Sequence, residues 1–281
     1  MPSIFCGRQI ERSETPGPNP SRDRIVTAEC KWARYPKLPR DRKTKRRRSP
    51  VSWILGFCSK FLVLLIVLTA LQILVLRFIN PPFTLHTGWR WLHGKATGRP
   101  YPWPLQAWRS LEGISPELVK AVLAGEDQRF FRHHGFDFIE IDQAFRELLR
   151  DERVRGASTI SMQVARTVFL WPDRNWLRKV AEAYYTVMIE TLWDKKRILE
   201  VYLNTVDWGT GIIGAEAAAR RYFGKASDRI TPPEAALMAA ILPSPHKWSP
   251  VDPTEAVRSR QERILRDMKR MHLPRSPGYF E

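Results

Sequence analysis

Acidic, amide and cationic side chains gather in three stretches of this sequence. In the first, Glu126 and Asp127 follow an apolar run and precede Phe130 and Phe131. A carboxylate beside aromatic rings is a candidate general acid or base, because desolvation disfavours its charged form. A Glu-Asp pair at a helix end is more often a solvated terminus, so both interpretations stay open for this stretch taken alone.

The second stretch presents hydroxyls, an amide and a cation. Thr159, Gln163 and Arg166 recur at helical spacing on one face, with Ser158 just before them. One acid, Asp173, stands against the cations between 153 and 179, which are Arg153, Arg155, Arg166, Arg174, Arg178 and Lys179. Such a face at a helix N-terminus suits phosphate oxygens. The alternative is a polar helix face over a packing seam of small residues.

The third stretch places Glu182 one helical turn beyond Arg178 and Lys179. These three side chains are a candidate cluster for chemistry. The alternative is an intrahelical ion pair, which stabilises a helix by only about 0.2–0.5 kcal/mol.

The elements that position these residues are predicted to be helices. Ser115 and Pro116 have the form of an N-cap and a first helical residue. Apolar residues recurring at three and four positions predict helices at 116–125, 139–149, 158–169, 176–193, 194–203, 232–242 and 254–271. Strand patterns are scarce, so the fold class is mainly α, in one domain of about 190 residues.

Three further patterns argue against other chemistries. The GxGxxG match at 209–214 lacks the βα alternation of a dinucleotide site. The SxxK match at 244–247 has Pro245 at its second position, which spoils the helical turn an acylating Ser-Lys pair needs. His133 and His134 are adjacent and point to different sides of the backbone, so a protein-built zinc site with Asp137 is not expected.

A membrane span is predicted near the N-terminus. Residues 61–76 carry no charge and extend an apolar stretch from 54 to 79, about the length a bilayer core requires. Of the formal net charge of +17, residues 1–50 contribute 14 basic and 5 acidic side chains. Basic residues crowd this N-terminal flank, which predicts a cytoplasmic N-terminus and places residues 81–281 outside the cytoplasm.

The predicted organisation has four parts: a basic, disordered tail at 1–50, the span at 54–79, a juxtamembrane connector at 80–112 and a catalytic domain at 113–273. Because over half of the net charge belongs to the tail and its flank, no nucleic-acid partner is expected. The three cysteines, Cys6, Cys30 and Cys58, lie in the tail or the span. Cysteine nucleophiles, disulfides and thiolate metal sites are thereby excluded from the exported region.

Four motifs in this order resemble the peptidoglycan glycosyltransferases of family 51, namely EDQRFF at 126–131, RGASTI at 155–160, RKVAEA at 178–183 and KRILEVYLN at 196–204. The resemblance covers about residues 79–270 and departs from the commonest pattern at Met162, Arg166 and Thr167. It implies a lysozyme-like α fold behind a single transmembrane helix in the bacterial inner membrane. The chain is too short for the transpeptidase domain of class A penicillin-binding proteins, so a monofunctional enzyme is expected.

The resemblance also assigns roles. Glu126 is expected to be the general base and Glu182 the second catalytic carboxylate. The expected substrate-binding residues are Asp127, Ser158, Thr159, Gln163, Arg166, Arg178 and Lys179. The implied partners are lipid II, the growing glycan strand, membrane lipid and other cell-wall synthesis proteins. A divalent cation, Mg²⁺ or Mn²⁺, is the one cofactor considered, through Glu182, and no organic cofactor is expected.

Two other functions compete with this prediction. A peptidoglycan hydrolase could also use a Glu in a lysozyme-like fold, with water in place of the acceptor sugar and a general acid for the leaving oxygen. A catalytically weak scaffold of wall synthesis is the non-enzymatic alternative. The cations at 153–179 and the predicted anchor favour a membrane-borne pyrophosphate donor, which argues against the hydrolase. Intact Glu126 and Glu182 argue against the scaffold.

Overall fold

The computed structural model describes residues 50–98, 102–103, 107–150, 156–173 and 175–274. All of the predicted tail except Pro50 lies outside the described residues, as do three of the cations noted above, Arg153, Arg155 and Arg174.

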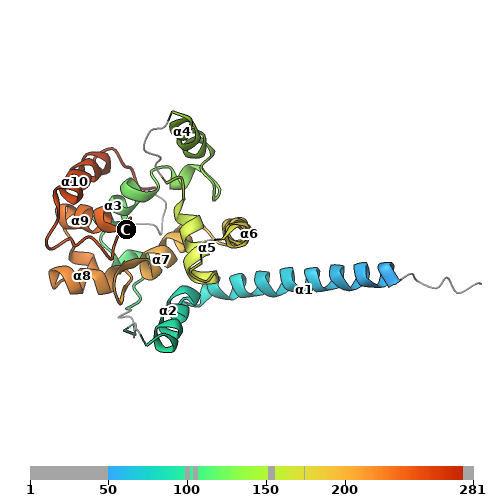
Figure 1. Ribbon diagram of the computed structural model, residues 1–281. Helices are drawn as coiled ribbons and strands as arrows, with labels where there is room; N and C mark the ends of the chain where they lie inside the picture. The colour runs from blue at the N-terminus through green and yellow to red at the C-terminus, as the bar shows by residue number, and fades with distance from the viewer. Residues whose placement is uncertain (1–49, 99–101, 104–106, 151–155, 174, 275–281) are drawn as a thin grey trace, which may run out of the picture. The chain divides into compact units, whose positions relative to one another are not determined.

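Helices make up almost all of the regular structure (Figure 1). They are α1 (Pro50–Phe78), α2 (Leu85–Ala96), α3 (Pro116–Glu126), α4 (Phe138–Leu149), α5 (Ile160–Phe169), α6 (Trp176–Leu192), α7 (Lys195–Thr205), α8 (Ala215–Phe223), α9 (Pro232–Ile241) and α10 (Glu255–Met268). Two short strands, β1 (Asp207–Gly209) and β2 (Ile212–Ile213), pair antiparallel. The prediction of a mainly α fold is confirmed.

Side-chain caps fix where the helices of the site begin. The Ser115 hydroxyl accepts a hydrogen bond from the Glu117 backbone N–H, with Pro116 at the first helical position. Asn175 and Asp194 likewise accept from backbone N–H groups at the starts of α6 and α7. Each cap satisfies a donor that the helix cannot bond internally, so the local sequence determines these boundaries.

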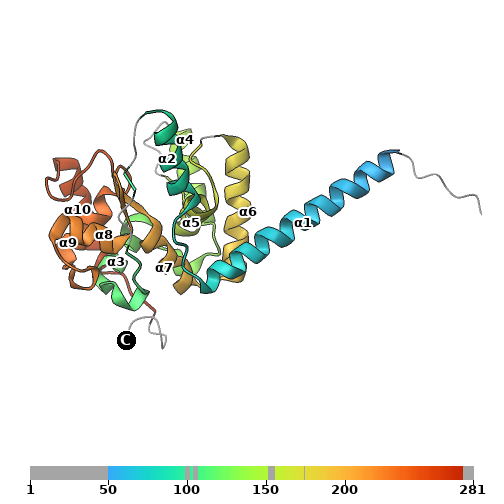
Figure 2. The ribbon, with the colours of Figure 1, turned by 90° about the horizontal axis from the view of Figure 1, so that it is seen from below.

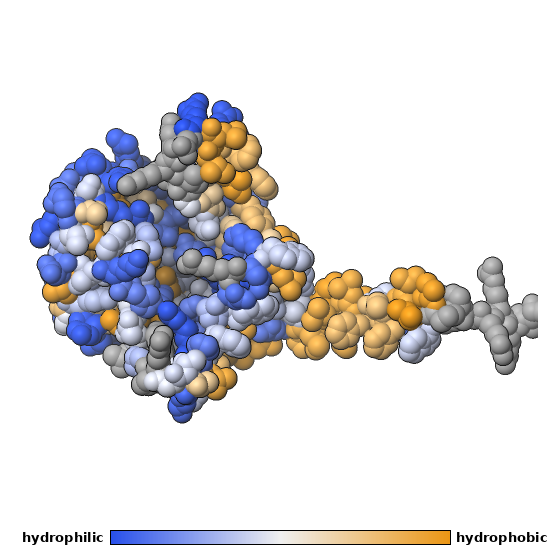
Figure 3. All heavy atoms as spheres, viewed as in Figure 1, coloured by the Kyte–Doolittle hydropathy of each residue, from blue (hydrophilic) through white to orange (hydrophobic). Residues whose placement is uncertain are grey.

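Helix α1 is long and apolar enough to cross a bilayer. Its 29 residues, at about 1.5 Å each, exceed a hydrocarbon core of about 30 Å. Most of its large hydrophobic side chains are exposed, and they appear as the orange surface along α1 in Figure 3. The helix begins four residues before the predicted span and ends one residue before the predicted end.

The last turns of α1 are bonded to α6 and α7. The Trp193 indole Nε1 donates to the Ile73 carbonyl at 2.8 Å, and the Arg197 guanidinium donates to the Leu76 carbonyl at 2.8 Å. The hydroxyls of Thr69 and Tyr184 lie 2.6 Å apart. Helices α6 and α7 are therefore tied directly to the apolar helix.

Most of the remaining helices form two groups. Helix α9 packs against α3 and α10, and α5 packs against α2, α6 and α7 (Figures 1 and 2). The C-terminal end of α3 and the N-terminal half of α5 approach each other where the two groups meet, as the hydrogen bond between Glu126 and Gln163 shows. This junction positions the polar and charged side chains that could carry out a reaction.

Two helices were not predicted, and each has a physical reason. Helix α2 lies in the Pro- and Trp-rich connector, where Gly88 and the scattered aromatic residues obscure a helical period. Helix α8 begins directly after the GxGxxG match. The glycines of that match form the β1–β2 hairpin, with positive φ at Gly211 and Gly214.

Gly214 joins this hairpin to α8, and its replacement tests how much this position contributes to the stability of the fold. Its φ is +85°, and a Cβ there would lie 2.8 Å from the Asn204 carbonyl oxygen. We expect Gly214→Ala to lower the free energy of unfolding by about 2 kcal/mol, because it adds left-handed backbone strain and a clash with backbone. Thermal unfolding measures the effect. Gly88→Ala in α2, where the Cβ meets only ordinary contacts, is the control and should be neutral or stabilising.

Candidate active site

Glu126 is the last residue of α3 and lies at the junction of the two helix groups. Its side chain is 14% exposed. The Gln163 amide Nε2, from α5, donates to Oε2 at 3.0 Å. The Arg260 guanidinium Nη2, from α10, lies 3.3 Å from Oε1. A carboxylate held on both oxygens and still partly open to solvent is positioned to take up a proton.

The orientation of the Gln163 amide is set by Tyr202 of α7. The Tyr202 hydroxyl donates to the Gln163 Oε1 at 3.4 Å, which leaves Nε2 to face Glu126. Burial, followed by the negative charge of Glu126, raises the pKa of Tyr202 well above its usual value, so the phenol remains protonated and able to donate. Neither Tyr202 nor Arg260 was predicted as a site residue from the sequence, because each reaches the site from a distant part of the chain.

The pKa of Glu126 is raised, and burial is the main cause. The hydrogen bond from Gln163 and the positive charges of Arg260 and Arg166 act in the opposite direction and lower it, while the negative charge of Asp127 raises it further. A raised pKa makes the carboxylate a stronger proton acceptor than a solvated glutamate. The cations help to keep it ionised.

Arg166 lies one helical turn after Gln163 on α5. Among the described residues, no carboxylate forms an ion pair with its guanidinium, although its charge acts on Glu126. Thr159 caps α5, and its hydroxyl donates to the Gly135 carbonyl at 2.5 Å. Ser158 is partly exposed just before that cap. Arg166 is thus open to an anionic ligand, whereas the Thr159 hydroxyl is engaged within the protein.

Asp127 points into the protein. Its Oδ1 lies 2.9 Å from the His133 Nε2, and its Oδ2 accepts from the Ile160 backbone N–H at 2.9 Å. Asp137 joins this buried group, so that the three residues have potential metal-ligand atoms within 4.8 Å of one another, a proximity that sequence spacing did not predict. Asp137 Oδ1 also caps α4. These bonds fix the start of α5 beside Glu126, and a substrate contact by Asp127 stays a prediction.

The third predicted cluster is an interlocked ion group on α6. Glu182 is fully buried, and its two oxygens accept from the Arg178 Nη1 at 2.8 Å and the Lys179 Nζ at 2.6 Å. The side chain of Lys179 is half exposed, whereas that of Arg178 is 12% exposed. The group keeps a net charge of +1. Glu182 therefore orients both cations in this structure, and its assignment as a second catalytic carboxylate stays a prediction.

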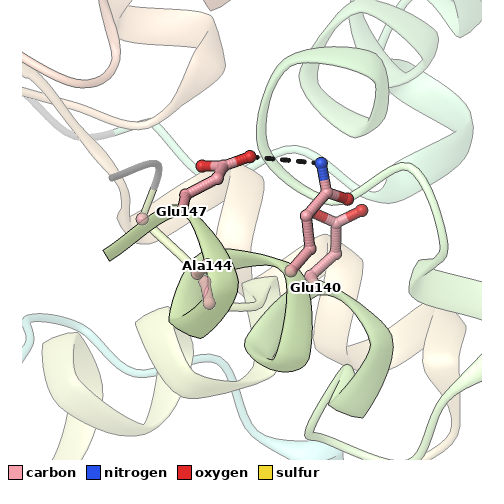
Figure 4. A pocket seen from close by; sticks show the side chains of 6 residues that line it. Glu140, Ala144 and Glu147 are labelled. Atoms are coloured by element: carbon pink, nitrogen blue, oxygen red, sulfur yellow. Dashed lines mark hydrogen bonds between the residues drawn. The ribbon is translucent and has the colours of Figure 1, made fainter. Parts of the chain in front are cut away.

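A separate surface hollow lies beside α4 (Figure 4). It is lined by Glu140, Gln143, Ala144 and Glu147 of that helix and by residues 156–157, and Gln143 Nε2 donates to Glu147 Oε1 at 3.2 Å. Of the residues that the structure describes, two carboxylates and no cation line it. An anionic donor would be repelled there, so this hollow is not the candidate site.

Known proteins resemble this chain over most of its length. A sequence model for the family described as Transglycosylase matches residues 96–269. The chain is 47% identical to the biosynthetic peptidoglycan transglycosylase of Pseudomonas aeruginosa over 210 residues, 74% of this chain and 90% of that protein. The protein of the same name from Xanthomonas campestris pv. campestris is 42% identical over 240 residues, 85% of this chain and 95% of the relative. That from Rhodospirillum centenum is 54% identical over 161 residues, 57% and 70% of the two chains.

Proposed function

Because the chain belongs to the transglycosylase family and is a peptidoglycan glycosyltransferase, we propose that it polymerises lipid II into β-1,4-linked glycan strands with Glu126 as the general base. The observation that carries the proposal is the Glu126 carboxylate, which is held between α3, α5 and α10, has a raised pKa and lies within the electrostatic reach of Arg166, whose guanidinium forms no ion pair within the described part of the chain.

The proposed reaction is a single displacement. The 4-hydroxyl oxygen of an acceptor sugar attacks the anomeric carbon of a donor, a new carbon–oxygen bond forms, and the bond to the lipid pyrophosphate breaks. Glu126 takes the hydroxyl proton as the new bond forms. Attack opposite the leaving group inverts the α-linked donor into a β-linked product. Undecaprenyl pyrophosphate leaves with the bonding electron pair.

Positive charge at the leaving group is the second requirement. A pyrophosphate leaves as an anion, so fixed cations stabilise it more than a proton donor does. Arg166, Arg178 and Lys179 are the proposed contacts. Gln163, with Ser158 and Thr159 at the start of α5, is proposed to position the donor sugar.

The surroundings of Glu182 do not suit a metal ion. Both of its oxygens are bonded to cations and its side chain is fully buried, so it has no free oxygen for Mg²⁺ or Mn²⁺. We therefore assign Glu182 the role of holding Arg178 and Lys179, and we place any divalent cation on the pyrophosphate. No step of the proposed reaction needs a metal ligand from the protein.

Membrane lipid is a proposed partner of the same surface. Near the start of α6, Trp176, Leu177 and Val180 are exposed beside Arg178 and Lys179. Because α6 is tied to α1 through Tyr184, these apolar side chains suit contact with lipid while the cations suit headgroup phosphates. We propose an inner-membrane enzyme with a cytoplasmic N-terminus and a periplasmic catalytic domain. Other cell-wall synthesis proteins are proposed as partners.

Incubation of the purified full-length chain with lipid II tests the proposed reaction. The expected product is a long glycan strand that lysozyme-type digestion reduces to disaccharide units. Release of sugars from finished peptidoglycan without polymerisation would instead support a hydrolase. Binding of lipid II without turnover would support a scaffold.

A further inference from the structure

Arg260 lies 134 residues after Glu126 in the chain and meets it in the fold. Its Nη2 donates to the Gly125 carbonyl at 2.9 Å and lies 3.3 Å from Glu126 Oε1. Both partners belong to the last two residues of α3. One guanidinium therefore contacts the end of the helix and the carboxylate that projects from it.

The contact with the Gly125 carbonyl satisfies an acceptor that α3 cannot bond internally. The last four carbonyls of a helix lack partners within the helix, and a cation there also complements the helix dipole. The second contact has a different effect, because it constrains the side chain of Glu126 through the carboxylate oxygen that Gln163 does not contact. The carboxylate is thereby held from α5 on one oxygen and from α10 on the other.

The geometry of the guanidinium indicates more than a stabilising contact. Its Nε is buried and has no hydrogen-bond partner within the described residues. Leaving a buried donor unsatisfied costs stability, so packing alone does not favour an arginine here. An arginine in this position is better explained by the chemistry of the carboxylate that it faces.

We propose that Arg260 is a positioning residue for the base: it fixes the direction of the Glu126 carboxylate and keeps it ionised for proton uptake. The inference rests on the proposed function of Glu126. It adds a residue from α10 to a site that the sequence motifs place on α3, α5 and α6.

The electrostatic surroundings determine the direction of the expected effect. The charged and titratable groups that act on Glu126 are Arg260, Arg166, Asp127 and Tyr202. Burial raises the pKa of Glu126, and Arg260 is one of the two cations that lower it. Removal of Arg260 therefore raises this pKa. The base must be ionised to act. As the pH is lowered, the variant should therefore lose activity at a higher pH than the wild type does.

The test compares Arg260→Met with Arg260→Lys in the full-length protein. The pH profile of kcat/KM for lipid II polymerisation is measured for both. Arg260→Met should shift the acid limb to higher pH and lose several-fold more activity at low pH than on the plateau. Arg260→Lys should restore the position of the acid limb, because it keeps the charge. Its activity on the plateau should stay below that of the wild type, because lysine loses the two-point contact.

Arg263→Met is the matched control. Arg263 is exposed on the same helix, and its replacement should change neither the pH profile nor thermal unfolding. An acid limb that does not move in Arg260→Met would overturn the proposal, as would an equal loss at every pH that lysine fails to reverse. Glu126→Gln separates the two hypotheses: if that variant remains active, the assignment of the base fails, whereas an inactive Glu126→Gln with an unshifted Arg260→Met removes only the role of Arg260.

Discussion

Replacement of Glu126 by glutamine is expected to reduce lipid II polymerisation by at least about 100-fold, the lower end of the contribution of a positioned general base. Glutamine has nearly the same shape but cannot take up the acceptor proton at neutral pH. The initial rate of glycan strand formation measures the loss. Because Gln163 and Arg260 both donate toward the carboxylate, one of them will face the new amide N–H group, and a small loss of thermal stability is expected as well.

Two further variants make this result specific. Glu126→Asp keeps the charge but withdraws it by one methylene, so a partial activity between wild type and glutamine is expected. Glu117→Gln removes a carboxylate from the first turn of the same helix, where it pairs with Lys120, and should leave the rate unchanged. Glu126→Gln with more than a tenth of the wild-type rate would show that another group accepts the proton.

Much of the helical framework could be predicted because its determinants are local. Seven predicted helices correspond to α3, α4, α5, α6, α7, α9 and α10, with ends that differ by at most three residues. Caps such as Ser115 and Asp194 specify helix starts from adjacent residues alone. The boundary of α10 was predicted least well, because Lys269 to Met271 continue the polar and apolar pattern beyond the last helical hydrogen bonds.

The site was predictable only in part, for a related reason. Glu126 and Gln163 lie in motifs with recognisable residue types, and the structure brings them together. Tyr202 lies in the fourth motif, but nothing in the sequence around Tyr202 or Arg260 indicates a role in the site, since an arginine on a charged helix and a tyrosine on an apolar face are ordinary residues in sequence. Long-range packing of α7 and α10 against the site gives them their function.

Burial also limits which contacts the predicted polar site residues can make. The resemblance to family 51 implies that Asp127, Thr159 and Glu182 face a substrate. In the structure their side chains are bonded to His133, Gly135 and the two α6 cations, and their contacts with a substrate stay a prediction. A buried polar group must find partners within the protein, so its nearest hydrogen bonds determine its role more than its residue type does.

Arg178→Ala is expected to impair use of the donor by about 100-fold, the scale on which one fixed electrostatic contact to a developing charge contributes. The Arg178 guanidinium is anchored to buried Glu182 and so cannot move away from the position it holds, which makes it a preorganised contact for a leaving pyrophosphate. The measurement is transfer from a lipid-pyrophosphate donor to an acceptor sugar that lacks pyrophosphate, with each substrate varied in turn. Donor KM and kcat should suffer, while the acceptor KM should stay near its wild-type value.

Loss of stability must be separated from loss of this contact. Removal of Arg178 leaves the fully buried Glu182 with Lys179 alone, which should cost about 2 kcal/mol of unfolding free energy. Arg178→Lys keeps a cation beside Glu182 and serves as the matched variant. If it restores stability but not donor use, the planar guanidinium itself engages the pyrophosphate, because only arginine offers two parallel donors to phosphate oxygens. Equal loss of donor and acceptor affinity in a folded Arg178→Ala variant would instead make this ion group a structural support of α6 with no direct part in leaving-group departure.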